Sequence, residues 1–195
     1  MIADQDRSGW FGASDTDYIV GNLDTKSFEK WWQTKEGFAE NTIKTDAMLA
    51  GTNYEHAIID AIDERLEKDK QILIPELHLR VNLDANSSDT IYEIKTYKHG
   101  KGFKMPLKYK RQVWVQLYAS KLKKAFVVAY GLTEKEYDNY FLPVDKDRMQ
   151  IHEIEPNEEF INTVYLPRLK FMAHCLDNGI FPTNERWQQW ILSVA

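Results

Sequence analysis

Hydrophobic and polar residues follow two different periods along this chain, and the change of period separates helical stretches from extended ones. Apolar residues recur at the three- and four-residue spacing of amphipathic helices in four stretches: residues 26–37, 45–68, 108–122 and 157–178. Alternating or unbroken apolar runs typical of strands occupy three stretches: residues 72–81, 90–97 and 125–131. The order helix, strands, helix, strand predicts an α/β fold with a mixed sheet flanked by helices.

Turn and capping residues set the expected boundaries of these elements. Residues 86–89 have the composition of a hairpin turn, and residues 83–85 continue the strand before it. Ser14 is predicted to be the N-cap of a short helix over residues 15–20, because its hydroxyl can accept from a free backbone N–H. Gly179 is predicted to end the last helix, since glycine adopts the left-handed conformation found there.

Length and composition favour one globular domain over residues 1–195. The chain is 43% hydrophobic, no repeat or linker divides it, and no apolar run approaches the ~20 residues that span a bilayer. Its N-terminus lacks the features of a secretory signal, so we expect a cytoplasmic protein. The single cysteine, Cys175, is expected to be buried in a helix. The expected parts are a core, an N-terminal segment and a C-terminal helical extension, at about residues 45–131, 1–44 and 132–195.

Positive charge is concentrated in one part of an otherwise acidic chain. The formal net charge is -5, yet residues 95–124 contain ten Lys or Arg and no Asp or Glu. A charge run is often only a solvated face, but aromatic residues are interspersed here, as on surfaces that follow a nucleic-acid backbone. We therefore expect DNA phosphate contacts in this block, with Lys98, Lys108 and Arg111 as candidates.

Two carboxylates and a lysine are expected to converge at the predicted hairpin. Residues two apart in a strand share a face, so Glu93 and Lys95 project together, and Asp84 can reach Glu93 if the strands pair. With the Ile94 carbonyl, these carboxylates form an all-oxygen ligand set for one or two Mg²⁺ or Mn²⁺ ions. Such an ion would hold a phosphate and activate water, while Lys95 would position or deprotonate the nucleophile, or stabilise the charge of the transition state. Ordinary surface residues are the alternative on this pattern alone.

Three further features favour a reactive site. Glu55 lies at the edge of the apolar stripe of its predicted helix, where a carboxylate needs a partner or a metal. Gln112 and Gln116 share one helical face and could donate to a phosphate or to water. Arg7 and Ser14 could form an anion site at a helix N-terminus. The alternatives are a boundary salt bridge, two solvent-facing glutamines, and a lead-in salt bridge with a simple cap.

Four motifs follow one another over residues 7–131: Arg7 with Phe11-Gly12-Ala13-Ser14-Asp15, Gly51-x3-Glu55, Asp84-x8-Glu93-Ile94-Lys95-Thr96, and Tyr109-x2-Gln112-Val113. In this order and spacing they resemble the PD-(D/E)xK nucleases, and more narrowly the YqaJ-like viral recombinase group that includes the lambda-type exonuclease. The resemblance implies a restriction-endonuclease-like core. Two departures from the family pattern are Ala13 and Ala85, where the family usually has glycine, and Ala85 disfavours a positive φ.

The resemblance also implies residue roles and an activity. Asp84, Glu93 and the Ile94 carbonyl would bind metal with help from Glu55, and Lys95 would be the catalytic lysine. The remaining implied roles are the helix glutamine, Gln112 in preference to Gln116, and a 5′-phosphate pocket formed by Arg7 and Ser14. The implied activity is 5′→3′ digestion of one strand of linear double-stranded DNA in phage-type recombination. A single-strand annealing protein would be its partner and a trimer its assembly.

Two other functions remain compatible with the sequence. An endonuclease on the same core would use the same carboxylates and lysine but would also cut closed circular DNA. A non-catalytic DNA-binding or DNA-mimicking protein would fit the net acidity, although it would not need Lys95 beside two carboxylates.

Overall fold

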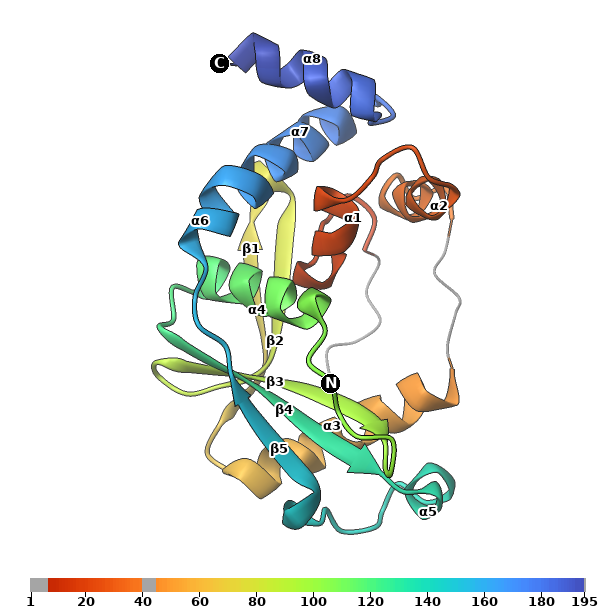
Figure 1. Ribbon diagram of the computed structural model, residues 1–195, viewed down its shortest axis with the longest axis vertical. Coiled ribbons are helices and arrows are strands. Elements are labelled where there is room, and N and C mark those ends of the chain that lie inside the picture. The colour runs from red at the N-terminus through yellow and green to blue at the C-terminus, as the bar shows by residue number, and fades with distance from the viewer. Residues whose placement is uncertain (1–6, 40–44, 195) are drawn as a thin grey trace.

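A five-stranded mixed sheet organises the molecule, as Figure 1 shows. The computed structural model describes residues 7–39 and 45–194. The strands lie side by side in chain order: β1 (Glu67–Ile74), β2 (Leu79–Asn86), β3 (Thr90–Lys98), β4 (Lys124–Leu132) and β5 (Met149–Glu153). Neighbouring strands are antiparallel except β3 and β4, which are parallel because a helix crosses between them. The predicted α/β class with a mixed sheet is confirmed.

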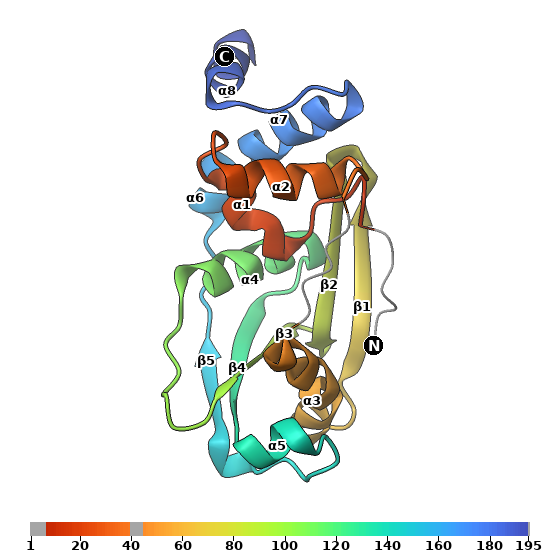
Figure 2. The ribbon, with the colours of Figure 1, turned by 90° about the vertical axis from the view of Figure 1, so that its right-hand side faces the viewer.

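Helices flank this sheet and extend it at one end. They are α1 (Thr16–Val20), α2 (Lys26–Lys35), α3 (Asp46–Ile62), α4 (Leu107–Ser120), α5 (Glu134–Asp138), α6 (Glu158–Phe160), α7 (Leu166–Asp177) and α8 (Asn184–Val194). In Figures 1 and 2, α1, α2, α7 and α8 gather around the far end of the β1–β2 hairpin, away from α5. No helix in the described part of the chain is both long and apolar enough to cross a membrane.

Successive residues of the strands face two separate cores. In β4, Val127 belongs to a large core with Val113 of α4, whereas its neighbour Val128 belongs to a smaller core with Tyr54 and Ile58 of α3. This alternation follows from the two-residue period of a strand, and it places α4 on one face of the sheet and α3 on the other. Side chains of α3 and α4 can therefore meet only where the sheet opens.

The predicted helix 45–68 and the predicted strand 72–81 were each too long. The helix ends at Ile62, because Asp63 has an extended backbone and β1 then pairs along its length with β2. The supposed single strand is a hairpin, in which Pro75–Leu77 forms a 3-10 turn and His78 adopts a left-handed φ of 50°. Proline lacks the N–H of a central strand, so Pro75 marks this reversal.

The N-cap predicted at Ser14 was wrong. Ser14 lies inside a 3-10 turn, Ala13–Asp15, that leads directly into α1. The side chain that closes this turn is Asp15, whose Oδ2 accepts from the Gly12 backbone N–H at 2.7 Å. An aspartate performs the capping that the sequence pattern had assigned to the neighbouring hydroxyl.

The end of the predicted C-terminal helix is confirmed, and three elements were missed. The helical stretch contains a π turn, Ile161–Tyr165, between α6 and α7, and Gly179 follows its end with a φ of 60°. Cys175 is buried in α7, as expected. The missed elements are α5, β5 and α8.

Candidate active site

The sheet opens between β2 and β3, and this opening creates the site. The two strands pair only at Ala85–Tyr92 and Asn86–Ile91, beside their turn, whereas β2 pairs with β1 along its length. Beyond this point Asp84 Oδ2 accepts a hydrogen bond from the Ile94 backbone N–H at 2.8 Å. The Asp84 carboxylate thus takes the place of a main-chain acceptor where the ladder ends, which satisfies the Ile94 amide.

Glu93 and Lys95 project to the same side of β3, as the strand period predicted. Lys95 Nζ lies 2.6 Å from Glu93 Oε1. The Glu93 side chain is only 2% exposed and that of Lys95 19% exposed. The Lys95 ammonium also lies 4.9 Å from the centre of the Tyr109 ring of α4. This lysine is therefore fixed by a carboxylate and an aromatic face rather than extended into solvent.

Both glutamines of α4 donate to the same carboxylate. Gln112 Nε2 lies 2.6 Å from Glu93 Oε1, and Gln116 Nε2 lies 2.5 Å from Glu93 Oε2. Gln116 is fully buried and also donates to the Asn82 carbonyl, whereas Gln112 lines the cavity at the site. Gln112 is thus the glutamine that faces the cavity, and Gln116 supports Glu93 from the buried side.

Glu55 reaches the opening from the other face of the sheet. One turn before it in α3, Gly51 packs so closely on β3 that a Cβ there would lie 2.8 Å from Thr96 Oγ1. The absence of a side chain at Gly51 lets α3 approach the strand, and Glu55 then lines the same cavity as Asp84 and Glu93.

Burial and neighbouring carboxylates raise the pKa of two of these acids, Asp84 and Glu55. Burial, followed by the charges of Glu93 and Glu55, raises the pKa of Asp84 well above its ordinary value. Burial, then Glu93 and Asp69, raises the pKa of Glu55 to about 7. Burial opposes the charge of Lys95, but Glu93 and Asp84 outweigh it and raise the Lys95 pKa. An excess of partly buried negative charge with oxygen donors is the environment that a hard divalent cation stabilises.

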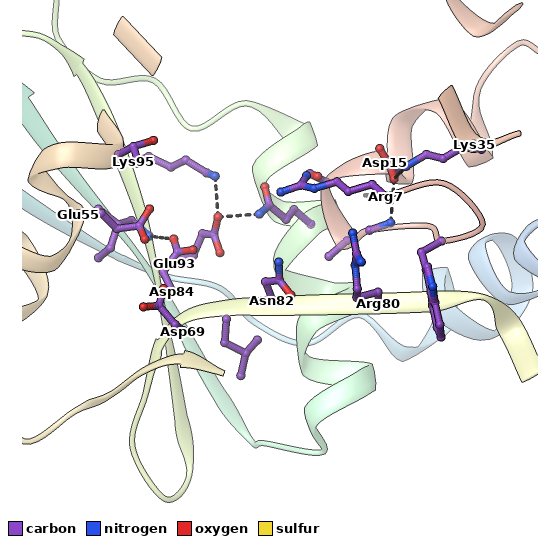
Figure 3. A pocket seen from close by; sticks show the side chains of 18 residues that line it. Arg7, Asp15, Lys35, Glu55, Asp69, Arg80, Asn82, Asp84, Glu93 and Lys95 are labelled. Carbon is purple, nitrogen blue, oxygen red and sulfur yellow. Dashed lines mark hydrogen bonds and ion pairs between the residues drawn. The ribbon is translucent and has the colours of Figure 1, made fainter. Parts of the chain in front are cut away.

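The cavity at the opening has a volume of about 320 Å³ and two ends of opposite charge, as Figure 3 shows. One end holds the acidic residues together with Lys95. At the other end are Arg7, Lys35 and Arg80, with Asn82 between the two groups. The acidic end carries Glu55, Asp69, Asp84 and Glu93.

Asp15 organises the basic end. Its Oδ2 pairs with Lys35 Nζ at 2.6 Å, and its Oδ1 accepts from Trp31 Nε1 at 2.9 Å. Arg7 and Ser14, predicted to form an anion pocket, are exposed and line this part of the cavity. The two residues are therefore brought into one cavity with the acidic group, although their role with a phosphate stays a prediction.

The other predicted DNA contacts lie outside the cavity. Lys98 Nζ pairs with Glu134 at 3.1 Å on the surface, and the Lys108 ammonium lies over the Tyr109 ring. Arg111 Nη1 pairs with Asp17 of α1 at 2.9 Å, so this arginine ties two helices together. Lys98 and Lys108 are exposed, and binding of DNA by all three stays a prediction.

Sequence reasoning missed several residues that line the cavity. Arg80 and Asn82 could have been found, because they share the two-residue period of Asp84 along β2. Lys35 could have been noticed as a lysine one turn after Trp31 on the apolar side of α2; it is only 5% exposed. Asp69 is the unpaired residue of β1 between the pairs Lys68–Ala85 and Lys70–Leu83, with a φ of 58°, and the sequence pattern gave no sign of this irregularity.

A second group of ligand atoms adjoins the predicted one. Glu55, His56 and Asp69 each offer an oxygen or nitrogen, and these atoms lie within 4.8 Å of one another. His56 Nε2 is 2.9 Å from Asp69 Oδ2. The sequence had given no reason to include His56, since its partner Asp69 comes from a different element.

The two departures from the family motifs leave the backbone undisturbed. Ala85 is a fully buried strand residue paired with Lys68 and Tyr92, and neither it nor Ala13 has a positive φ. The glycine usual in the family is therefore not required for φ at either position.

The fold is that of alkaline and phage-related exonucleases. The alkaline exonuclease LHK-Exo from Laribacter hongkongensis superposes with a TM-score of 0.66 at 20% identity, covering 97% of this chain and 96% of that one. A phage-related exonuclease from Haemophilus somnus 129PT superposes with a TM-score of 0.61 at 12% identity, covering 95% and 96%. No family model and no curated protein matches the sequence. The motif-based resemblance is thus confirmed at the level of the fold.

Proposed function

We propose that this protein is a metal-dependent exonuclease that digests linear double-stranded DNA. The observation that carries the proposal is the cavity at the sheet opening, where a buried Glu93–Lys95 pair and two further carboxylates adjoin a basic end. The fold shared with exonucleases supports it, and LHK-Exo has also been solved in complex with dAMP. The acidic end has ligands for the cation that hydrolysis needs, and the basic end has cationic side chains for a phosphate group.

Four groups fit a divalent cation, Mg²⁺ or Mn²⁺. They are the carboxylates of Asp84, Glu93 and Glu55 and the Ile94 carbonyl; His56 and Asp69 add donors beside Glu55. The fit rests on the donor set, which is mainly oxygen, and on the repulsion that raises the pKa of Asp84 and Glu55. A bound cation would neutralise phosphate charge and favour ionisation of water.

Lys95 has the position and charge for a role at the reacting phosphate. Its pKa is raised, so it stays an ammonium at neutral pH, where it stabilises the extra negative charge of the transition state. Gln112, on the same carboxylate, presents its amide to the cavity and can orient a phosphate oxygen or the attacking water. Glu93 holds both groups in place.

The basic end favours a DNA terminus as substrate. Arg7 and Ser14 would bind a terminal 5′-phosphate, with Lys35 and Arg80 as further cations, and this would set a 5′→3′ direction. Phage-type recombination with a single-strand annealing protein and a trimeric assembly follow from the family resemblance, and together with the expected cytoplasmic location they belong to the same proposal.

Digestion of duplexes labelled separately at each end tests the activity. We expect Mg²⁺- or Mn²⁺-dependent release of nucleotides from linear DNA, loss of activity with a chelator, and intact closed circles. Release should begin at the 5′ end. Cutting of closed circles would instead identify an endonuclease, and binding without cleavage a non-catalytic protein.

Substitutions test the residue roles. Asp84→Asn and Lys95→Ala should each abolish cleavage without unfolding the chain, because each removes one charge from the cavity. Asp147→Asn, an exposed aspartate outside the cavity, is the matched control and should leave activity unchanged. Unchanged cleavage by either site variant would reject the assignment.

End recognition has its own test. Arg7→Ala should slow digestion of 5′-phosphorylated duplexes more than that of 5′-hydroxyl duplexes, because only the former lose a charge-assisted hydrogen bond. Equal slowing of both substrates would show that the terminal phosphate binds elsewhere.

A further inference from the structure

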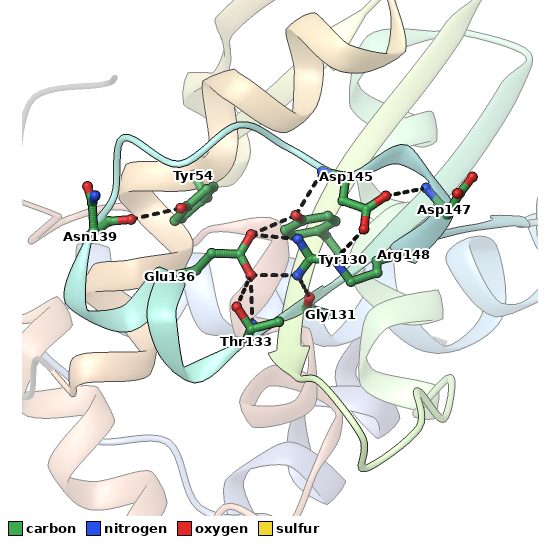
Figure 4. Close-up of polar contacts among 9 residues, drawn as sticks. All are labelled: Tyr54, Tyr130, Gly131, Thr133, Glu136, Asn139, Asp145, Asp147 and Arg148. Atoms are coloured by element: carbon green, nitrogen blue, oxygen red, sulfur yellow. Dashed lines mark hydrogen bonds and ion pairs between the residues drawn. The ribbon is translucent and has the colours of Figure 1, made fainter.

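The connection from β4 to β5 is fixed by a buried carboxylate, shown in Figure 4. Glu136 of α5 is 1% exposed, and its Oε2 accepts from Thr133 Oγ1 at 2.6 Å and from Arg148 Nη1 at 2.5 Å. Its Oε1 accepts from Tyr130 Oη at 2.7 Å and from Arg148 Nη2 at 2.9 Å. These bonds join the two ends of residues 133–148, a segment outside the core expected from the sequence.

This segment contacts α3 through Tyr54. The Tyr54 hydroxyl donates to the Asn139 carbonyl at 2.9 Å, and its ring stacks on Tyr130 with a centroid distance of 6.3 Å. Tyr140 meets the same ring edge-on at 6.4 Å. Tyr54 has no exposed surface, and burial followed by the Glu136 charge raises its pKa, so the phenol keeps the proton it donates. The contact is both aromatic and directional.

Tyr54 directly precedes Glu55, the site carboxylate contributed by α3. Apolar packing of Ile58 and Ile59 holds the helix on the sheet but is non-directional. The hydrogen bond to Asn139 fixes α3 at the turn that carries Glu55, while Gly51 sets the approach one turn earlier. The position of the Glu55 carboxylate relative to Asp84 and Glu93 thus depends on residues 133–148, which line no part of the cavity.

We propose that Tyr54 is a positioning residue: through its hydrogen bond to Asn139 it places the Glu55 carboxylate for cation binding. The inference rests on the proposed function, because it assumes that Glu55 helps to hold a divalent cation. It goes beyond that function because it gives residues 133–148, which contain α5, a role in positioning a site residue.

Tyr54→Phe tests the inference, since it removes only the hydroxyl. Titration of the full-length protein with Mn²⁺ in a calorimeter, without DNA, should show about three- to tenfold weaker binding, the effect of one lost hydrogen bond. Activity should need a correspondingly higher Mn²⁺ concentration, while KM for DNA stays unchanged. The matched control is Tyr92→Phe, which removes a phenol hydroxyl from β3 and leaves the Tyr54–Asn139 hydrogen bond intact. This variant should bind Mn²⁺ as the wild type does.

A double-mutant cycle separates positioning from general loosening. Glu55→Gln should weaken Mn²⁺ binding, and adding Tyr54→Phe should then cause little further loss, because the carboxylate it positions is gone. Fully additive losses, or wild-type Mn²⁺ affinity in Tyr54→Phe, would overturn the inference alone. Absence of Mn²⁺ binding by the wild-type protein would overturn the proposed function and this inference with it.

Discussion

Glu93 is the residue that connects the other side chains of the site. It is almost completely buried, yet it accepts from Lys95 Nζ, Gln112 Nε2 and Gln116 Nε2. A buried carboxylate without such donors is costly, so these three side chains make the charge tolerable at this position. They also fix the orientation of the carboxylate toward the cavity, whereas a glutamate on the surface would have no fixed orientation.

The two glutamines should therefore differ in their effect on stability. Gln116→Leu leaves the Glu93 Oε2 and Asn82 carbonyl acceptors without their buried donor, at a cost of about 1–3 kcal/mol. Gln112→Leu should cost less, because water in the cavity can replace the amide. Urea unfolding of both variants measures the difference, and equal losses would contradict the distinction between a supporting and a cavity-facing glutamine.

Glu136 should make stability depend on pH in the acidic range. Burial raises its pKa, but hydrogen bonds from Arg148 and Thr133 outweigh burial and lower it from an ordinary 4.5 to about 2. A lowered pKa stabilises the fold above pH ~4.5, and this contribution disappears as the pH falls toward 2. It amounts to at most about 3 kcal/mol at neutral pH.

Comparison with Glu136→Gln isolates this contribution. The variant should be less stable than the wild type at pH 7, and the gap should narrow between pH 4.5 and pH 2, as measured by urea unfolding at each pH. A gap that stays constant over that range would show that the Glu136 charge does not stabilise the fold.

At the scale of elements, the spacing between α3 and β3 decides whether the carboxylates meet. Gly51 is a position of close approach between them, and the motif spacing from Gly51 to Glu55 is one helical turn. A glycine inside a helix costs roughly 0.5–1 kcal/mol relative to alanine, so its presence here is explained by packing rather than helix propensity.

Gly51→Ala should accordingly lower activity. The new Cβ would lie 2.8 Å from Thr96 Oγ1. We expect α3 to move away from β3 to relieve this contact, and the moved helix would displace Glu55. Adding Thr96→Ala removes that oxygen; the Thr96 Cβ, at 4.0 Å, is in ordinary contact. The double variant should regain much of the rate on linear DNA, and a rate as low as that of Gly51→Ala would reject the steric explanation.

The elements that the sequence predicted well are those whose own periodicity decides their structure. β3, α4 and β4 were placed to within a residue or two because their apolar residues are buried in a regular pattern. β5 is a short edge strand with mostly exposed residues, and its structure comes from pairing with β4. Likewise, Asp84, Glu93 and Lys95 share one hairpin and could be predicted together, whereas Asp69 and Tyr54 contact His56 and Asn139, partners distant in sequence.

At the scale of the whole molecule, charge is separated rather than balanced. The net charge is -5, yet the connection between β3 and α4 exposes Lys101 and Lys104 close in sequence to Lys95. Figures 1 and 2 place this connection away from α7 and α8, at the end of the sheet nearer α5. An acidic protein can therefore bind DNA on one side while its remaining surface repels it.

Charge reversal in this connection should change how DNA affinity depends on salt. Each phosphate contact contributes about 0.9 to the slope of log K against log salt concentration, so Lys101→Glu with Lys104→Glu should reduce that slope by about 2. The matched control is Lys30→Glu with Lys170→Glu, which changes the net charge equally at exposed positions of α2 and α7. Fluorescence anisotropy of a labelled duplex in Ca²⁺, at several salt concentrations, gives both slopes. If only total charge mattered, the slope of log K against log salt concentration would decrease by the same amount in both double variants. A decrease only in Lys101→Glu with Lys104→Glu would locate the DNA path beside Lys95.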